Sequence, residues 1–596
     1  MMRTASFSLI LLLAATAPGR GQAPAPTPTP APADPRAWIA ESNRQAQVLL
    51  DVDARFSPEG AGEAGMSGLD REISSLTPES RKAQRQALEA ALATLETRLA
   101  SEPHPLVRQD LQILISAARD SIREMQLSDA RLVPYVDVPM RVYQGLRSLL
   151  DPQVAAGRRS AAVDRLRKYA GLDGGLDPLT TQAIRRTREG LANPRLLPPA
   201  RSKVERDLSN DAVVVTGIEK MLAEYKLEGW REPYAILARQ LAEYETFVRN
   251  EVLPKARTDF RLPPELYAFS LEEVGVDIAP EPLAAMAHQA FRDIQQQMAA
   301  LAPGIARARG QETSDYREVI RALKKEQLVG DAILPHYRKR LEEIEAIVRR
   351  EKLVTLPDRA ARIRIATDAE AAQTPAPNMR PPRLLGNTGE IGEFVLPLNV
   401  PAGSGGGDAG RFDDFTFEAA SWTLTAHEAR PGHEMQFAKM IEAGVSIPRA
   451  VFAFNSTNVE GWGLYAEWMM LPYMPAEGQL ISLQFRLLRA ARAFLDPELH
   501  LGRVTPDEAR RVLREDVGLS AAMTESEVER YMFRSPAQAT SYFYGYTRLQ
   551  ELRSQVERAM GGRFNALEFH DFILAQGLLP PALLKDAVLA RFTPVR

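Results

Sequence analysis

Residues 105–126, PLVRQDLQILISAARDSIREMQ, decide the fold class of this chain. Apolar side chains recur there at helical spacing, at Val107, Leu111, Leu114, Ala118, Ile122 and Met125. Side chains three or four positions apart lie on one face of an α-helix. The stretch therefore predicts an amphipathic helix that buries its apolar face against other helices.

The same helical period recurs on both sides of this stretch. It is repeated by Leu88, Leu92, Leu95 and Leu99, and again by Leu237, Leu241, Tyr244 and Val248. Helix-breaking residues separate these segments, at Pro103 and Pro105, Gly174-Gly175, Pro198-Pro199 and Pro263-Pro264. We therefore predict a mainly α fold.

Alternating strand patterns are scarce, and the best one is EFVLPLN at 393–399. Pro397 cannot donate a hydrogen bond to a neighbouring strand, which favours the edge of a sheet. The Gly-rich stretch 403–408 follows, and it lacks the Lys-Ser/Thr pair of a phosphate-binding loop. We interpret it as a surface loop.

Composition and charge limit the classes of function. The 596 residues predict two to four structural units, which a helical chain can merge into one body. Hydrophobic residues make up 45%, which is enough for a large core. The 74 basic and 77 acidic residues are well mixed, without the basic stripe that nucleic-acid binding requires. We expect no nucleic-acid partner, and the oligomeric state stays open.

The N-terminus resembles a secretory signal. Arg3 precedes an apolar run at 7–15 and then small residues, so residues 1–17 predict a signal peptide. Its cleavage site stays open because Pro18 follows, and an uncleaved anchor is the alternative. Residues 18–36 form a Pro-rich linker. We expect a periplasmic or secreted protein without a membrane span after processing.

Cysteine is absent from the 596 residues. A chain without cysteine has no disulfide scaffold, no thiolate nucleophile, no cysteine-ligated metal and no lipid anchor on cysteine. Any metal ligands must therefore be histidines or carboxylates.

The motif HEARPGH at 427–433 holds two of the seven histidines. The common HExxH motif places two zinc-binding histidines four residues apart on one helical face, and the glutamate between them is the general base. Here the spacing is six, which puts the side chains about 120° apart on a straight helix. Pro431 cannot bond to the carbonyl of His427, and Gly432 tolerates unusual backbone angles. Together they could bulge the helix and bring the histidines together.

Two alternatives to this bulge remain open. The helix could end near Arg430 and a second could begin at Pro431, which would leave His427 and His433 as unrelated surface residues. Alternatively, Glu434 could be the partner of His427, because seven residues return to the same face of a straight helix.

The segment NVEGWGLYAE at 458–467 offers a third ligand. Glu460 would complete a set of two histidines and one glutamate, which leaves the fourth zinc position to water. Glu467 lies seven residues further, on the same helical face, and could orient a ligand. A solvated helix carboxylate is the alternative for Glu467.

The ordered set of motifs carries a family resemblance. After HExxPGH and EGWxLYAE come DPELH at 496–500, PAQATSY at 536–542 and EFHDF at 568–572, and upstream lie LPD at 356–358 and the pair Pro381-Pro382. The chain resembles the bacterial family called domain of unknown function 885, which is grouped with gluzincin-type zinc metallopeptidases. The resemblance covers about residues 37–596 and is strongest after residue 270.

The resemblance implies two regions along the chain. It implies an N-terminal helical region at 37–270 and a catalytic helical region at 271–596. It also implies a large helical, metallopeptidase-like body with a small edge β-sheet beside the active-site helix.

The resemblance also implies the roles of individual residues. His427, His433 and Glu460 would bind Zn²⁺, with Glu428 as general base. Three positions depart from the family pattern, namely Glu434 in place of a second histidine, Glu498 in place of glycine, and Arg534-Ser535 in place of an aromatic residue.

Together these features predict a bacterial zinc peptidase in the periplasm or outside the cell. Glu428 would take a proton from water, and Tyr542 or His500 would stabilise the oxyanion. Tyr544 and Tyr546 compete with Tyr542, and a packing role stays open for each of these residues. The strand at 393–399 could pair with an extended peptide.

Two other functions stay open. The same site would serve a zinc amidase or esterase on a small non-peptide substrate, and a non-catalytic metal-binding protein is the third possibility. The other histidines, at 104, 288, 336 and 570, have no ligand context and are interpreted as structural.

Overall fold

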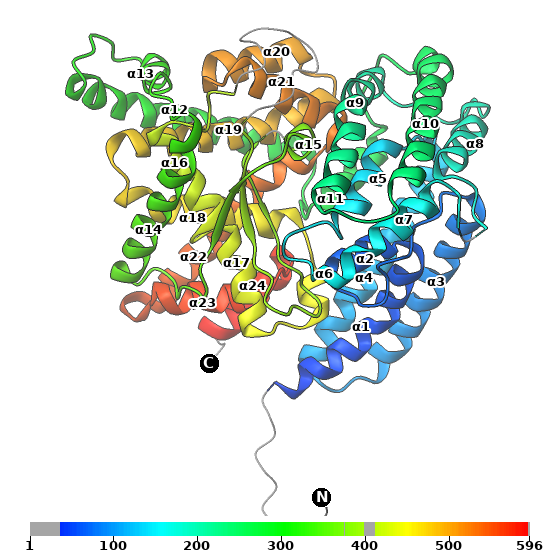
Figure 1. The fold of residues 1–596 in the computed structure, drawn as a ribbon. Coiled ribbons are helices and arrows are strands. Elements are labelled where there is room, and N and C mark those ends of the chain that lie inside the picture. Colours follow the sequence, from blue (N-terminus) through cyan, green and yellow to red (C-terminus); the bar gives the residue numbers. More distant parts are fainter. Residues whose placement is uncertain (1–35, 174, 375, 399–411, 594–596) are drawn as a thin grey trace, which may run out of the picture. The chain divides into compact units, whose positions relative to one another are not determined.

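The computed structural model of the chain describes residues 36–593, apart from 174, 375 and 399–411 (Figure 1). The predicted signal peptide, nearly all of the linker and the Gly-rich stretch 403–408 lie outside the described residues. From Trp38 onward the chain forms one compact unit. Among the described residues, no helix is both long and apolar enough to cross a membrane.

The prediction of a mainly α fold is confirmed. The first part of the unit contains α1 (Ala37–Phe56), α2 (Pro58–Ala64), α3 (Pro78–Ser101), α4 (Pro105–Arg131), α5 (Val138–Arg147), α6 (Ala156–Arg159), α7 (Ala161–Tyr169), α8 (Leu179–Leu191), α9 (Arg201–Glu224), α10 (Arg231–Phe247) and α11 (Pro264–Glu273). The middle part contains α12 (Pro280–Ala308), α13 (Tyr316–Leu323), α14 (Ile333–Glu351), α15 (Asp368–Gln373), α16 (Glu418–Leu424) and α17 (His433–Ala443). The last part contains α18 (Ser456–Met470), α19 (Ala476–His500), α20 (Pro506–Arg511), α21 (Ala521–Glu529), α22 (Ser541–Met560), α23 (Ala566–Ala575) and α24 (Pro581–Phe592).

Helix α4 is the helix predicted from residues 105–126, and all six of its predicted apolar positions are buried. Its register also buries one charged residue, Asp110, which accepts hydrogen bonds from the Ser446 hydroxyl at 2.6 Å and from Nε of Arg449 at 2.8 Å. Arg449 lies in the short π-helix η6 (Pro448–Phe452) and is itself buried. A buried ion pair therefore joins the first part of the chain to the segment between α17 and α18.

Two long helix pairs form the centre of the unit, α12 with α19 and α18 with α22. Helix α19 is buried over nearly its whole length, and it packs against α12, α16 and α22. Its polar positions include Arg486, Arg489 and Arg492, all buried. Buried guanidinium groups require carboxylate or aromatic partners, so this helix brings positive charge to the interior.

The described strands form one small sheet with the order β1-β3-β2. Strand β1 (Arg362–Ile365) pairs parallel to β3 (Glu393–Leu396), with Ile363 opposite Phe394. Strand β2 (Asn378–Arg380) pairs antiparallel to β3, with Met379 opposite Phe394. The expectation of a small sheet is confirmed, and the sheet contacts the π-helix η5 (Thr425–Ala429), which contains His427.

The prediction that 393–399 is an edge strand is wrong. Strand β3 is central, and both of its edges are occupied by β1 and β2. Pro397 is compatible with this position because the strand ends at Leu396, before the missing N–H would be needed. A substrate peptide therefore cannot add to β3 as a new strand.

Candidate metal centre

The HEARPGH segment is split between two helices. Helix α16 runs on into η5, which ends at Ala429, and α17 begins at His433. Between them Arg430 is extended, with φ −128° and ψ 135°. The predicted continuous, bulged helix is therefore wrong, and the chain breaks where the two-helix alternative placed the break. The surface position that this alternative implied is also wrong, because His427 and His433 are only 2% and 5% exposed.

The break depends on close packing at Gly432 and on Trp462. A Cβ atom on Gly432 would lie 1.9 Å from the carbonyl oxygen of His427 and 2.4 Å from that of Ala426. Its φ is −80°, so glycine is required here for space and not for a left-handed backbone. The indole N–H of Trp462 donates to the carbonyl of Pro431 at 3.0 Å. These contacts hold the chain folded back on itself, which brings His433 beside His427.

Three potential ligand atoms converge at this fold-back. Nε2 of His427 and Nε2 of His433 lie 3.1 Å apart, and Oε2 of Glu460 lies 3.2 Å from His433 and 3.4 Å from His427. Ligands at about 2.0–2.1 Å from a tetrahedral zinc ion lie roughly 3.3–3.4 Å from one another. The triangle has the size and the donor types of a His₂Glu zinc site. We call these three residues the ligand triangle.

Glu467 lies behind His427 and fixes its orientation. Its Oε1 accepts a hydrogen bond from Nδ1 of His427 at 2.7 Å, and Oε2 accepts one from the Thr423 hydroxyl at 2.5 Å. It also pairs with Arg489 at 3.2 Å and is 1% exposed, so the alternative of a solvated carboxylate is wrong. With Nδ1 engaged, Nε2 of His427 faces the triangle.

Burial and neighbouring charges act in opposite directions on these groups. Burial lowers the pKa of His427, but the hydrogen bonds with Glu460 and Glu467 outweigh burial. The net result is a pKa raised from 6.5 to about 9. Burial raises the pKa of Glu460, yet the two histidines hold it well below its ordinary value. The histidines and carboxylates thus stabilise one another's charges.

Glu428 lies beside the triangle with its carboxylate unengaged. It follows His427 in η5 and is 8% exposed. None of the residues that the structure describes donates a hydrogen bond to its oxygens. Burial raises its pKa, while His427 and His433 act to lower it. A buried carboxylate with free lone pairs can accept a proton from a bound water.

Of the three candidate tyrosines, Tyr542 packs against the triangle. Its ring is stacked with the His427 ring, with 6.1 Å between the centroids. Its hydroxyl accepts a hydrogen bond from Arg530 at 2.9 Å, which leaves its own proton available for donation. Tyr544 instead hydrogen-bonds to Asp277, and Tyr546 lies against Arg486.

The prediction that His500 donates to the oxyanion is wrong. Its Nδ1 accepts the backbone N–H of Leu262 at 3.2 Å, and its Nε2 donates to the carbonyl of Tyr531 at 2.9 Å. Burial lowers its pKa to about 4, so the ring is neutral at physiological pH. No ring nitrogen is left for a substrate, and His500 is a structural histidine stacked on Tyr267.

Glu434 and His570 also have packing roles. Glu434 accepts a hydrogen bond from Nε of Arg430 at 2.7 Å and is not part of the triangle, so it is not the partner of His427. His570 contacts the Tyr465 hydroxyl at 2.9 Å and the carbonyl of Leu353 at 2.7 Å. This geometry agrees with the structural interpretation of His570.

Comparison with known families identifies the chain at the level of the family. A family model described as "Bacterial protein of unknown function (DUF885)" matches residues 58–588. The chain belongs to the DUF885 family. None of the curated proteins matches it.

Solved structures support the fold of this DUF885 chain. A protein described as a lipoprotein from Colwellia psychrerythraea aligns with a TM-score of 0.75 and 20% identity, over 93% of this chain and 99% of that one. A lipoprotein of unknown function from Shewanella oneidensis aligns with a TM-score of 0.70 and 18% identity, over 92% and 99%. An oligoendopeptidase F from Bacillus anthracis aligns with a TM-score of only 0.31 and 12% identity, over 84% of this chain and 92% of that one, so its fold is not shown to be the same.

Sequence reasoning missed Gly463, which makes room for the triangle in this DUF885 chain. A Cβ atom at this position would lie 2.7 Å from Cε1 of His427 and 2.8 Å from Cε1 of His433. A glycine inside a helix costs about 1 kcal/mol relative to alanine, so it usually has a packing reason. The signal in the sequence was the presence of two glycines within one predicted helix, in EGWGLYAE. The other one, Gly461, also lies at a close contact, with Gly545 of α22.

Proposed function

We propose that this DUF885 chain is a bacterial zinc-dependent peptidase of the gluzincin type that acts in the periplasm or outside the cell. The observation that carries the proposal is the ligand triangle, with edges of 3.1–3.4 Å, next to the unengaged carboxylate of Glu428. A merely structural metal site has no need for such a neighbouring base. All of the proposed site residues lie in the region 271–596, which we take as the catalytic region.

His427, His433 and Glu460 would hold the zinc ion, and Glu467 would keep His427 in the orientation for binding. A bound zinc ion supplies Lewis acidity, which polarises a carbonyl group and lowers the pKa of water towards about 7.

The protein's own groups would handle the protons and the developing charge. Glu428 would accept a proton from the attacking water and later deliver it to the leaving amine. Tyr542 would donate its hydroxyl proton to the carbonyl oxygen as negative charge develops there. Arg530 supports this role because it donates to the same hydroxyl and so directs the tyrosine proton elsewhere. Exclusion of water by the buried surroundings strengthens these interactions.

The location of the protein is supported by its N-terminal sequence and by its structural neighbours. Arg3 followed by the apolar run at 7–15 is typical of an exported protein. Two neighbours are described as lipoproteins, which are exported proteins as well.

Paired variants test the assignment of the general base. We expect Glu428→Gln to retain about one zinc ion per chain but to lose peptide hydrolysis by about 10²-fold or more, because the proton acceptor is gone. Glu460→Gln should lose zinc itself, measured by elemental analysis of purified protein. Hydrolysis of a peptide library by Glu428→Gln at the wild-type rate would disprove the mechanism.

A substrate panel tests the bond that is cleaved. Peptides, small amides and small esters are offered to the zinc-loaded protein, and we expect the peptides to be cleaved with the highest kcat/KM. Preference for a small amide or ester would identify a zinc amidase or esterase. Absence of bound metal together with inactivity after zinc addition would favour a non-catalytic protein.

A further inference from the structure

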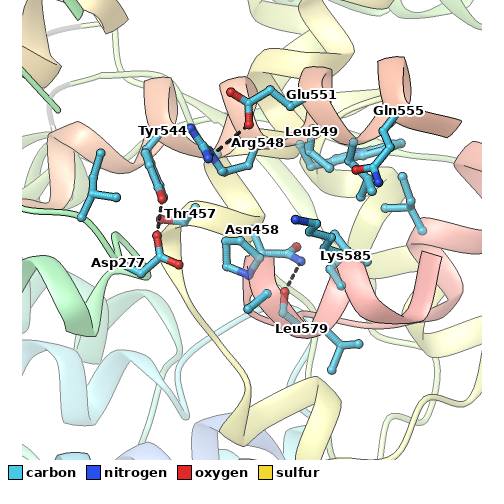
Figure 2. Close-up of a pocket in the computed structure, with 18 of the residues that line it drawn as sticks. Asp277, Thr457, Asn458, Tyr544, Arg548, Leu549, Glu551, Gln555, Leu579 and Lys585 are labelled. Atoms are coloured by element: carbon cyan, nitrogen blue, oxygen red, sulfur yellow. Dashed lines mark hydrogen bonds and ion pairs between the residues drawn. The ribbon is translucent and has the colours of Figure 1, made fainter. Parts of the chain in front are cut away.

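A second cavity lies on the opposite side of α18 from the ligand triangle. It has a volume of about 380 Å³ and is lined by residues of α17, α18, α22, α23 and α24 (Figure 2). Asn458 and Trp462 of α18 face this cavity, whereas Glu460 faces the triangle. Two residues correspond to about 200° around a helix, so α18 separates the two sites. The volume falls within the usual range for small-molecule pockets, roughly 300–1,000 Å³.

One wall of the cavity is apolar. Leucine and isoleucine side chains from three helices and from the segment before α24 supply it, at Leu549, Leu552, Ile573, Leu579 and Leu584. Such a wall favours a ligand with a branched or linear hydrocarbon group.

A buried acceptor points to a ligand with an N–H group. Gln436, of α17, is 3% exposed, and its Oε1 has no hydrogen-bond partner among the described residues. Its orientation is fixed by a chain of bonds, because Asn458 donates to the carbonyl of Leu579 at 2.8 Å and so offers Oδ1 to Nε2 of Gln436 at 2.9 Å. An unpaired buried acceptor is costly, and a donor on a ligand would satisfy it.

Two cationic groups point to a carboxylate on the same ligand. Lys585 extends from α24 towards the cavity in Figure 2 and has no ion-pair partner in the described part of the chain. Arg548 pairs with Glu551 at 3.1 Å, yet its buried Nε has no partner there. Asp277 is engaged by the Tyr544 hydroxyl. Because both lining carboxylates, Asp277 and Glu551, are already engaged, the charged donors left for a ligand are Lys585 and Arg548, beside the neutral amide of Gln555.

We propose that this cavity is a second small-molecule site, for a compound that combines an apolar body, an N–H donor and a carboxylate. N-acylated apolar amino acids and short apolar peptides have this chemistry. The carboxylate would contact Lys585 and Arg548, the N–H group would donate to Gln436, and the hydrocarbon group would lie against the leucine wall.

Calorimetric titration with three small probes tests the proposed ligand class. N-acetyl-L-leucine carries all three groups, N-acetyl-L-leucinamide lacks the carboxylate, and 4-methylpentanoate lacks the N–H group. We expect N-acetyl-L-leucine to bind with one-to-one stoichiometry and about threefold to fivefold more tightly than either analogue. The apolar dipeptide Leu-Leu is titrated as well. Tighter binding of Leu-Leu than of N-acetyl-L-leucine would identify a peptide site, and the reverse order would identify a site for N-acyl amino acids.

Two variants locate the binding. Lys585→Gln should weaken N-acetyl-L-leucine about threefold to fivefold and leave the amide unchanged, whereas Lys220→Gln, at an exposed lysine on α9, should bind like the wild type. Ala582→Trp should fill the cavity and abolish binding, with an unchanged circular dichroism spectrum, because Ala582 is an exposed lining residue.

Zinc removal separates the cavity from the triangle. Binding should persist after treatment with a chelator, because the triangle lies on the other face of α18. Three results would each overturn the proposal, namely no saturable binding at millimolar N-acetyl-L-leucine, loss of binding with the chelator, or wild-type binding by both Lys585→Gln and Ala582→Trp.

Discussion

Gly463 shows how a missing side chain shapes the ligand triangle. An alanine there would place a Cβ atom 2.7 Å from His427 and 2.8 Å from His433. Neither ring can retreat easily, because both are buried and His427 is held by Glu467. We expect Gly463→Ala to weaken zinc binding by about tenfold or more, measured by competition with a chromophoric chelator.

Gly304 provides the matched control for this substitution. It also lies inside a helix, α12, but a Cβ atom there meets nothing within 4 Å. Gly304→Ala should leave zinc affinity unchanged and stabilise the fold by up to about 1 kcal/mol. Equal zinc affinities for the two variants would mean that the crowding around Gly463 has no consequence.

Glu467 is the second residue that acts on the triangle indirectly. Glu467→Gln keeps the shape but removes the charge that His427 and Arg489 contact. We expect zinc affinity to fall about 10–100-fold, as for other carboxylates that support a metal-binding histidine. The control is Glu527→Gln, at a buried carboxylate that pairs with Arg492 and should affect folding stability without changing zinc affinity.

Most of the residues in this candidate site were predictable from the sequence. His427, Glu428, His433 and Glu460 came from motif order and residue chemistry, and Glu467 from helical spacing. His500 was predicted wrongly because its partners, the N–H of Leu262 and the carbonyl of Tyr531, are backbone groups on distant segments, which no motif encodes. Gly463 was missed because its role is to leave space, which becomes visible only once the two rings are placed.

At the scale of elements, α18 and α22 cross in close contact next to the triangle. Gly461 and Gly545 meet there, and a Cβ atom on Gly545 would lie 2.0 Å from the carbonyl oxygen of Thr457. We expect Gly545→Ala to lower the free energy of unfolding by about 1–3 kcal/mol, measured by denaturant titration. Gly562→Ala, where a Cβ atom meets nothing within 4 Å, should change it little, and equal stabilities would contradict the close crossing.

The elements themselves were predictable to different degrees. The 3.6-residue period locates α4 because it depends only on neighbours in sequence. The strand at 393–396 was also found, but its central position was not, since its partners are distant segments that show no pattern of their own. The chain break at 430–432 depends on Trp462, which lies about thirty residues away.

At the scale of the whole molecule, Asp496 makes stability depend on pH. Its Oδ1 accepts hydrogen bonds from Tyr267 and from the N–H of Ala537, while Oδ2 has no partner among the described residues. Burial raises its pKa from 3.8 to about 7 although these two bonds oppose the shift. The folded chain therefore keeps this proton at pH values where the unfolded chain has lost it.

The stabilisation from this proton is complete below about pH 4 and is lost as the pH rises through about 7. Asp496→Asn cannot titrate, so the difference in unfolding free energy between wild type and variant should shift by a few kcal/mol in favour of the variant between these limits. Chemical denaturation at pH 4, 5.5, 7 and 8.5, with zinc removed, measures it. A difference that is constant with pH would refute the assignment.

The Asp110–Arg449 pair has a consequence for how the chain can be divided. Asp110 lies in the region 37–270, and Arg449 lies in the region that carries the ligand triangle. A fragment consisting of 271–596 alone would lose the carboxylate of Asp110 and the surroundings at Gln109 and Trp38 that bury this guanidinium, so a surface that is now closed would face water. The N-terminal helices thus cover a charged surface of the region 271–596, and a shortened chain would have to receive them in trans or carry a redesigned residue at position 449.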